Sequence, residues 1–180
     1  MKVAFLQREE GGAPVTVGIQ QLIRDLAGIA AAFRAAVHEQ RDLPAALALV
    51  GDECVLANVP AGTGASGRDA LARYLEDDVL PHLPADLAFR RVSRTADQRR
   101  VVDESVVAFT HDRELPWLLP GVPATGRAVE VLAITVVGFR HASSQGVTRS
   151  RIVSHRTLWD HAGLLGQLRA TSTRNSLSST

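Results

Sequence analysis

Asp160 is the side chain best placed for acid–base chemistry in this sequence, because it follows the apolar stretch that ends in Leu158-Trp159. A carboxylate becomes a useful proton acceptor or donor when partial desolvation raises its pKa toward neutral pH. Its apolar neighbours, with Leu164 just after it, would supply that setting. An Asp directly before a helix is also a preferred N-cap, and this role alone explains an Asp here. The sequence is compatible with both roles of Asp160, as a catalytic group and as a helix cap.

Two histidines are candidate partners for this carboxylate. His111 ends a predicted strand on the same face as Phe109, where it would polarise a carbonyl oxygen or hold a proton. The alternative is a strand-end histidine that bonds to a loop. His155 lies on the opposite face of its strand from Asp160 if side chains alternate strictly. The two cannot then enter one pocket without a bulge, so His155 is the weaker candidate.

Apolar residues in a loop rich in Pro and Gly, Leu115–Gly126, are predicted to line a pocket at the rim of a sheet. The alternative is that they plug the edge of the sheet. The predicted substrate-binding residues are Trp117, Leu119, Phe109, Trp159 and His155.

No cofactor or metal site is predicted. Metal binding needs His and carboxylate side chains that converge, whereas the adjacent pairs His111-Asp112 and Asp160-His161 point apart on a strand. Gly62–Gly67 matches G-x-G-x-x-G, but a dinucleotide site also needs a βαβ unit and an acidic residue about 20 positions on. Asp86 lies near that distance, yet it precedes the next strand. We therefore expect a flexible loop over the mouth of the pocket.

Composition favours one intracellular domain. The chain has 180 residues, a formal net charge of +1 and 20 basic residues that are scattered along it, so no nucleic-acid partner is expected. Cys54 is the only cysteine; it excludes an intrachain disulfide and lies in an apolar run typical of a core. No apolar run is long enough for a signal peptide or a membrane span. We expect a cytoplasmic protein.

The apolar spacing predicts an α+β fold with helices first and strands after them. Steps of three and four mark a long helix from Ile19 to about Gln40, and steps of two mark the later strands. Residues 1–18 are predicted to be an arm, 19–168 the domain, and 169–180 a flexible tail. The expected elements are helices at 19–40, 43–50, 68–80 and 161–168, and strands at 53–59, 87–94, 100–111, 127–140 and 151–160.

Three motifs carry a resemblance to a known family. They are Leu119–Glu130, a Pro-rich turn entering a long strand; Trp159–Leu168, a Trp-Asp-x-Ala-Gly-Leu-Leu ending; and Gly67–Leu71. With the order of elements, they resemble the nuclear transport factor two-like superfamily and, within it, the SnoaL-like polyketide cyclase and ester cyclase branch. The resemblance implies a cone, in which a curved, mostly antiparallel sheet wraps around the long first helix and leaves a pocket at its open end. It also implies a homodimer and a small apolar or polyketide-like ligand.

The resemblance also implies a role for Asp160, because several enzymatic branches use the Asp that ends the last strand as acid or base. The leading hypothesis is a cofactor-independent cyclase or isomerase in which Asp160 removes the proton α to a carbonyl and His111 polarises the oxygen. The alternative is a non-catalytic ligand-binding or dimerisation module. The ketosteroid isomerase-like pattern adds a pocket tyrosine as oxyanion donor. Tyr74, the only tyrosine, falls instead in a predicted helix.

Overall fold

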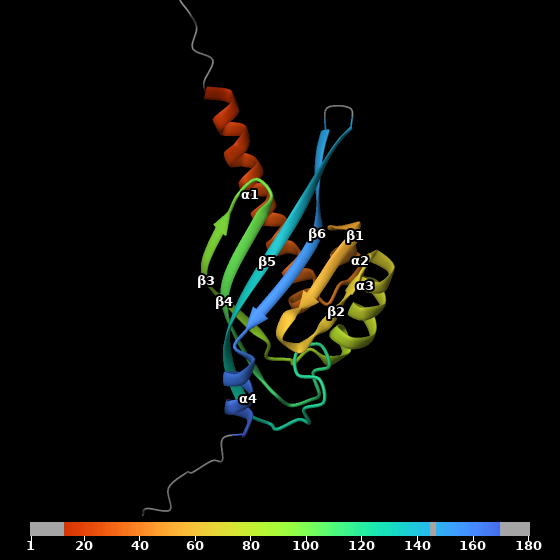
Figure 1. Cartoon of the computed structure of the whole chain (residues 1–180), viewed down its shortest axis with the longest axis vertical. Helices are drawn as coiled ribbons and strands as arrows, with labels where there is room; N and C mark the ends of the chain where they lie inside the picture. The colour runs from red at the N-terminus through yellow and green to blue at the C-terminus, as the bar shows by residue number, and fades with distance from the viewer. Residues whose placement is uncertain (1–12, 145–146, 170–180) are drawn as a thin grey trace, which may run out of the picture.

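A curved six-stranded sheet and one long helix against it organise the molecule (Figure 1). The computed structural model describes residues 13–144 and 147–169. The strands are β1 (Val50–Asn58), β2 (Thr63–Ser66), β3 (Ala88–Ala96), β4 (Arg100–Thr110), β5 (Ala128–Ser144) and β6 (Val147–Trp159), and the α-helices are α1 (Ala13–Ala35), α2 (Leu43–Leu47), α3 (Arg68–Tyr74) and α4 (His161–Arg169).

The strand order is β2-β1-β6-β5-β4-β3, and β1 and β6 form the one parallel pair among the paired strands described. Strands β3 to β6 form an antiparallel meander, in which each strand pairs with the next. The predicted α+β class with a mostly antiparallel sheet around a long N-terminal helix is confirmed.

The apolar face of α1 packs toward the sheet, as its spacing predicts. Leu26, Ala30, Phe33 and Val37 are all buried, and they recur at helical steps of three and four. The helix begins at Ala13 rather than at Ile19 and passes into a π-helical turn at Ala36–Gln40. Residues 1–12 of the predicted arm and 170–180 of the predicted tail lie outside the described residues.

The glycine-rich segment is an ordered edge strand, which corrects the prediction of a flexible loop. Thr63–Ser66 pairs antiparallel with β1, with Gly64 opposite Ala57. Gly64 has φ +142°, and a Cβ there would collide with the backbone oxygen of Leu56. Only glycine lets the two strands approach this closely, so these glycines serve the edge of the sheet.

Strands β5 and β6 are longer than predicted and form the long ribbon at the centre of Figure 1. Their register shifts between Gly138 and Phe139. A Cβ on Gly138 would collide with the side chain of Ser154 on β6. In the described ranges, no helix is long and apolar enough to cross a membrane.

Candidate ligand pocket

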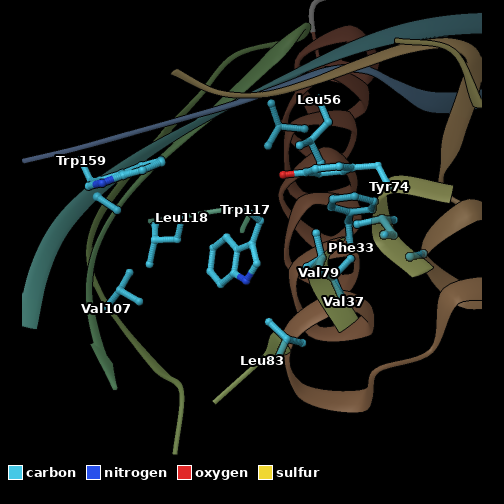
Figure 2. Packing of buried hydrophobic residues seen from close by; sticks show 14 of the residues in the cluster. Phe33, Val37, Leu56, Tyr74, Val79, Leu83, Val107, Trp117, Leu118 and Trp159 are labelled. Carbon is cyan, nitrogen blue, oxygen red and sulfur yellow. The ribbon is translucent and has the colours of Figure 1, made fainter. Parts of the chain in front are cut away.

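A pocket lies between α1, α3 and the inner face of the sheet, with a cavity volume of about 80 Å³. Most of its lining is apolar, and Figure 2 shows some of these apolar residues, among them Phe33, Trp117 and Trp159. Helices and turns contribute Ala30, Phe33, Arg34, Val37, His38, Tyr74, Leu75, Val79, Trp117 and Leu118. Strands contribute Leu56, Asn58, Phe89, Asp103, Ser105, Val107, Val131, Ala133, Thr135, Val137, His155, Thr157 and Trp159.

One straight row of polar side chains crosses the sheet wall of the pocket. Asn58 on β1 is in register with Thr157 on β6, Thr157 with Thr135 on β5, and Thr135 with Asp103 on β4. All four line the pocket, and residues in register on neighbouring strands lie about 5 Å apart. The row therefore spans the pocket, with an amide at one end and a carboxylate at the other.

Asp103 is held in an ion pair that also reaches α1. Arg94 on β3 donates from Nε to Oδ1 of Asp103 at 2.6 Å and from Nη2 to Oδ2 at 2.7 Å. Its Nη1 donates to the backbone oxygen of Ala27 at 3.3 Å. Such two-pronged pairing fixes the carboxylate plane. Among the described residues, Asp103 is the only acidic side chain that lines the pocket.

At the other end of the row, Asn58 belongs to a buried hydrogen-bonded cluster with Tyr74 and Thr63. Asn58 Nδ2 donates to Tyr74 Oη at 3.0 Å and to the backbone oxygen of Trp117 at 3.1 Å. Tyr74 Oη donates to Thr63 Oγ1 at 3.3 Å, and Thr63 Oγ1 donates to the same Trp117 oxygen at 2.7 Å. Burial raises the pKa of Tyr74, so its hydroxyl stays protonated.

This cluster ties the Pro-rich loop to the sheet. Trp117 and Leu118 project from that loop into the pocket lining, and Figure 2 shows Tyr74 reaching toward them from the α3 side. Loop position therefore depends on β1, β2 and α3 together. Tyr74, which the sequence places only in a helix, lines the pocket from that helix.

Two histidines line the pocket and are both kept neutral by burial. His155 packs its ring 5.2 Å from that of Phe33, and His38 lies 5.0 Å from the ring of Phe89 and 6.0 Å from that of Trp117. Burial lowers the pKa of each to about 4, and their mutual repulsion contributes for His155. His38 Nδ1 lies 3.2 Å from the backbone oxygen of Arg34.

Asp160 faces away from this pocket. It is exposed, and its Oδ1 accepts from the backbone N–H of Gly163 at 2.9 Å. Leu164 N–H donates to the backbone oxygen of Asp160 at 3.0 Å, which closes the first turn of α4. The geometry is that of a helix N-cap. Strand alternation explains it, because His155, Thr157 and Trp159 turn inward and the next residue does not.

His111 is also absent from the pocket lining. It is fully buried just past β4, with Nδ1 3.2 Å from Thr125 Oγ1. Its backbone oxygen accepts from the N–H groups of Thr125 and Gly126 at 3.0 and 2.8 Å, and its own N–H donates to Arg127 at 2.8 Å. Burial lowers its pKa. His111 therefore anchors the base of the Pro-rich loop, and the structure does not bring it together with Asp160.

The predicted substrate-binding residues divide into two groups. Trp117, Trp159 and His155 line the pocket, whereas Leu119 and Phe109 are buried in the core outside the lining. Leu118 lines the pocket in place of the predicted Leu119. The backbone N–H groups of both residues donate to the oxygen of Leu115, which closes a tight turn.

Cys54 is a buried residue of β1. Burial raises the pKa of the Cys54 thiol to about 11, which leaves it without nucleophilic character near neutral pH. Within the described residues, no three His, Cys, Asp or Glu side chains gather as metal ligands would.

Sequence reasoning missed Asp103, Asn58 and His38, although a signal existed for each. Asp103 continues the alternation of Ser105 and Val107 two residues back along β4. Asn58 follows Leu56 at the same spacing on β1. His38 follows Arg34 and Ala30 at steps of four, on the polar margin of the apolar face of α1.

Comparison with known proteins places this fold. No family model and no curated protein matches the sequence. Among solved structures, an NTF2-like protein of unknown function from Burkholderia pseudomallei is 17% identical, with a TM-score of 0.56 over 80% of this chain and 97% of its own. A protein from Shewanella putrefaciens assigned as a SnoaL-like polyketide cyclase is 17% identical, with a TM-score of 0.58 over 93% and 97%.

A third similar structure is an LEH-like epoxide hydrolase from Mycobacterium tuberculosis, 18% identical, with a TM-score of 0.54 over 84% of this chain and 91% of its own. At these identities the shared feature is the fold. The chain has the nuclear transport factor two-like fold, and its structural neighbours include the SnoaL-like proteins that its motifs resemble.

Proposed function

We propose that the chain binds a compact, largely apolar molecule with one polar edge in this pocket. The observation that carries the proposal is the polar row from Asn58 to Asp103, set in a wall that is otherwise mostly apolar. Small-molecule sites commonly have this composition, in which apolar walls give affinity and a few polar groups give orientation.

The cavity volume supports a ligand about the size of one ring. One water molecule needs about 10–15 Å³ on this scale, so about 80 Å³ accommodates roughly five to eight non-hydrogen atoms. A single ring with one substituent fits without rearrangement. A polyketide of several fused rings would require the Trp117 loop to move.

The test is ligand binding by the purified protein, with Ala133→Leu as the blocking variant. Ala133 lines the pocket, so three added carbons would occupy much of the space and weaken binding at least tenfold. Ala108→Leu is the matched control on β4, because Ala108 is not part of the lining. Extraction and mass spectrometry would identify a bound molecule, and thermal shift would screen single-ring compounds. Equal binding by wild type and Ala133→Leu would refute the proposal.

A second candidate function is cofactor-independent proton transfer of the cyclase or isomerase type. Asp103 favours it, since it places a carboxylate against an apolar cavity where a ligand would be desolvated. In this proposal Asp103 takes the role that the sequence suggests for Asp160. Asp103→Asn should abolish turnover of a proven substrate, whereas Asp160→Asn should keep it. The opposite result would return the role to Asp160.

We also propose that the protein is cytoplasmic and that two copies associate through the outer face of the sheet. Ile134 and Leu158 are neighbours in register and are 42% and 40% exposed, with Leu132 at 45% beside them. Light scattering would show a dimer that Ile134→Lys dissociates. Val59→Lys, at a similarly exposed residue in a turn, is the control and should leave the mass unchanged.

A further inference from the structure

In the Asn58 cluster, the N–H and O–H donors of Asn58, Tyr74 and Thr63 already bond to acceptors inside the protein. Both hydrogens of Asn58 Nδ2 have acceptors in Tyr74 Oη and the Trp117 oxygen. The single hydroxyl hydrogen of Tyr74 goes to Thr63, and that of Thr63 goes to the Trp117 oxygen. What remains for a ligand at this end is acceptor capacity, such as Asn58 Oδ1.

The opposite end of the row offers acceptors as well. An ionised carboxylate has about four lone-pair sites and no hydrogen to donate. Arg94 takes one direction on each oxygen of Asp103, so each oxygen has a further site. Since the guanidinium approaches from β3, a ligand in the pocket meets a charged group that can only accept.

His38 also offers a hydrogen-bond acceptor to a ligand. Its Nδ1 lies 3.2 Å from a backbone carbonyl oxygen, which can only accept, so Nδ1 carries the hydrogen. In a neutral imidazole the other nitrogen is then an acceptor. Three groups in the lining can therefore accept a hydrogen bond from a ligand: Asn58 Oδ1 on β1, the Asp103 carboxylate on β4, and His38 Nε2 in the π-helical turn after α1.

The lining residues also include donors. The indole N–H groups of Trp117 and Trp159 are buried and have no partner among the described residues, and a hydroxyl oxygen can accept from such a donor while its own hydrogen goes to an acceptor. Thr135 and Thr157 lie between the two ends of the row, and their hydroxyls can donate or accept according to the neighbour. Arg34 is the one cation that the described part of the chain contributes to the lining. It is paired with Glu39, and its guanidinium carbon lies 5.2 Å from the centre of the Phe89 ring.

We propose that the pocket selects a ligand that donates hydrogen bonds, a compact alcohol or phenol, over a carbonyl compound of the same size and shape. The inference rests on the proposed binding function and names its ligand class. A ketone would place an acceptor against Asp103, His38 or Asn58 Oδ1 and leave each of these unsatisfied, whereas a hydroxyl would supply the missing hydrogen.

The experiment compares cyclohexanol with cyclohexanone by calorimetry on the full chain. The two compounds have the same ring and number of heavy atoms, and their size suits the cavity. We expect cyclohexanol to bind about ten- to a hundredfold more tightly, the range for one hydrogen bond to a charged group. Equal affinity, or tighter binding of the ketone, would overturn the inference and leave the proposed function intact. Binding of neither compound would overturn both.

The variant Asp103→Asn tests whether Asp103 is the side chain that causes the preference for the alcohol. An amide can donate as well as accept, so the preference for the alcohol should fall to less than a third of its original ratio and the ketone should bind more tightly than to wild type. Asp97→Asn makes the same change in the β3–β4 turn, outside the lining, and should keep the original ratio. An unchanged ratio in Asp103→Asn would refute the assignment to Asp103. If that variant does not fold, the ratio in the unaltered protein still decides the inference.

Discussion

Removal of the Tyr74 hydroxyl tests whether the buried cluster holds the pocket loop in place. The hydroxyl accepts from Asn58 at 3.0 Å and donates to Thr63 at 3.3 Å. A buried hydrogen bond contributes about 0.5–1.5 kcal/mol net. Asn58 keeps its bond to the Trp117 oxygen, so its amide is not left without a partner. We expect Tyr74→Phe to lower the free energy of unfolding by about 2 kcal/mol.

Urea unfolding followed by tryptophan fluorescence would measure this loss, since Trp117 reports on the loop. For a chain of this length, each kcal/mol corresponds to a change in Tm of roughly 2–4 °C, so a fall of roughly 4–8 °C is expected. A double-mutant cycle with Thr63→Val should show a coupling energy of about 0.5 kcal/mol or more, because the two hydroxyls share a network. A loss below about 0.5 kcal/mol, or strict additivity, would refute the reasoning.

Three further predictions concern the cap, the two pocket histidines and the edge strand. Asp160→Ala should cost about 1 kcal/mol in urea unfolding while Asp160→Asn stays close to wild type; equal losses would contradict the cap. Because the native pKa values of His38 and His155 are about 4 rather than 6.5, the native state binds fewer protons than the unfolded chain between these values, and stability should fall as pH drops from 6.5 to 4. His155→Phe should remove about 3 kcal/mol of that fall at most, and an unchanged pH profile would argue against it. Gly64→Ala should lose about 2 kcal/mol or more from its collision with Leu56 and its positive φ, and a neutral result in thermal unfolding would show that β2 can shift.

The fold could be predicted because its signals are local and repeated. The apolar steps along α1 and the alternation along β4 and β6 each give the same answer over many residues. β2 was missed since four residues rich in glycine carry little strand propensity. Its pairing depends on the close approach of Gly64 to β1, a tertiary contact that no local pattern expresses.

The site was harder to predict because one residue of register reverses a side chain. Alternation correctly separates His155 from Asp160, but the family resemblance gives weight to Asp160, whose side chain caps α4. The polar row was invisible for a related reason. Asn58, Thr157, Thr135 and Asp103 lie on four strands, and only the register of the sheet places them in line.

The parallel pairing of β1 with β6 has a consequence for the order of events during folding. The hairpins from β3 to β6 join strands that are adjacent in the chain and can close early, since short loops cost little entropy. β1 must wait for a strand synthesised roughly a hundred residues later, and such non-local pairing slows folding. Asn58 reaches Thr157 only at that step. The pocket therefore forms only after β6 has left the ribosome, and a nascent chain halted before β6 would have strands β3 to β5 of the meander but no complete pocket.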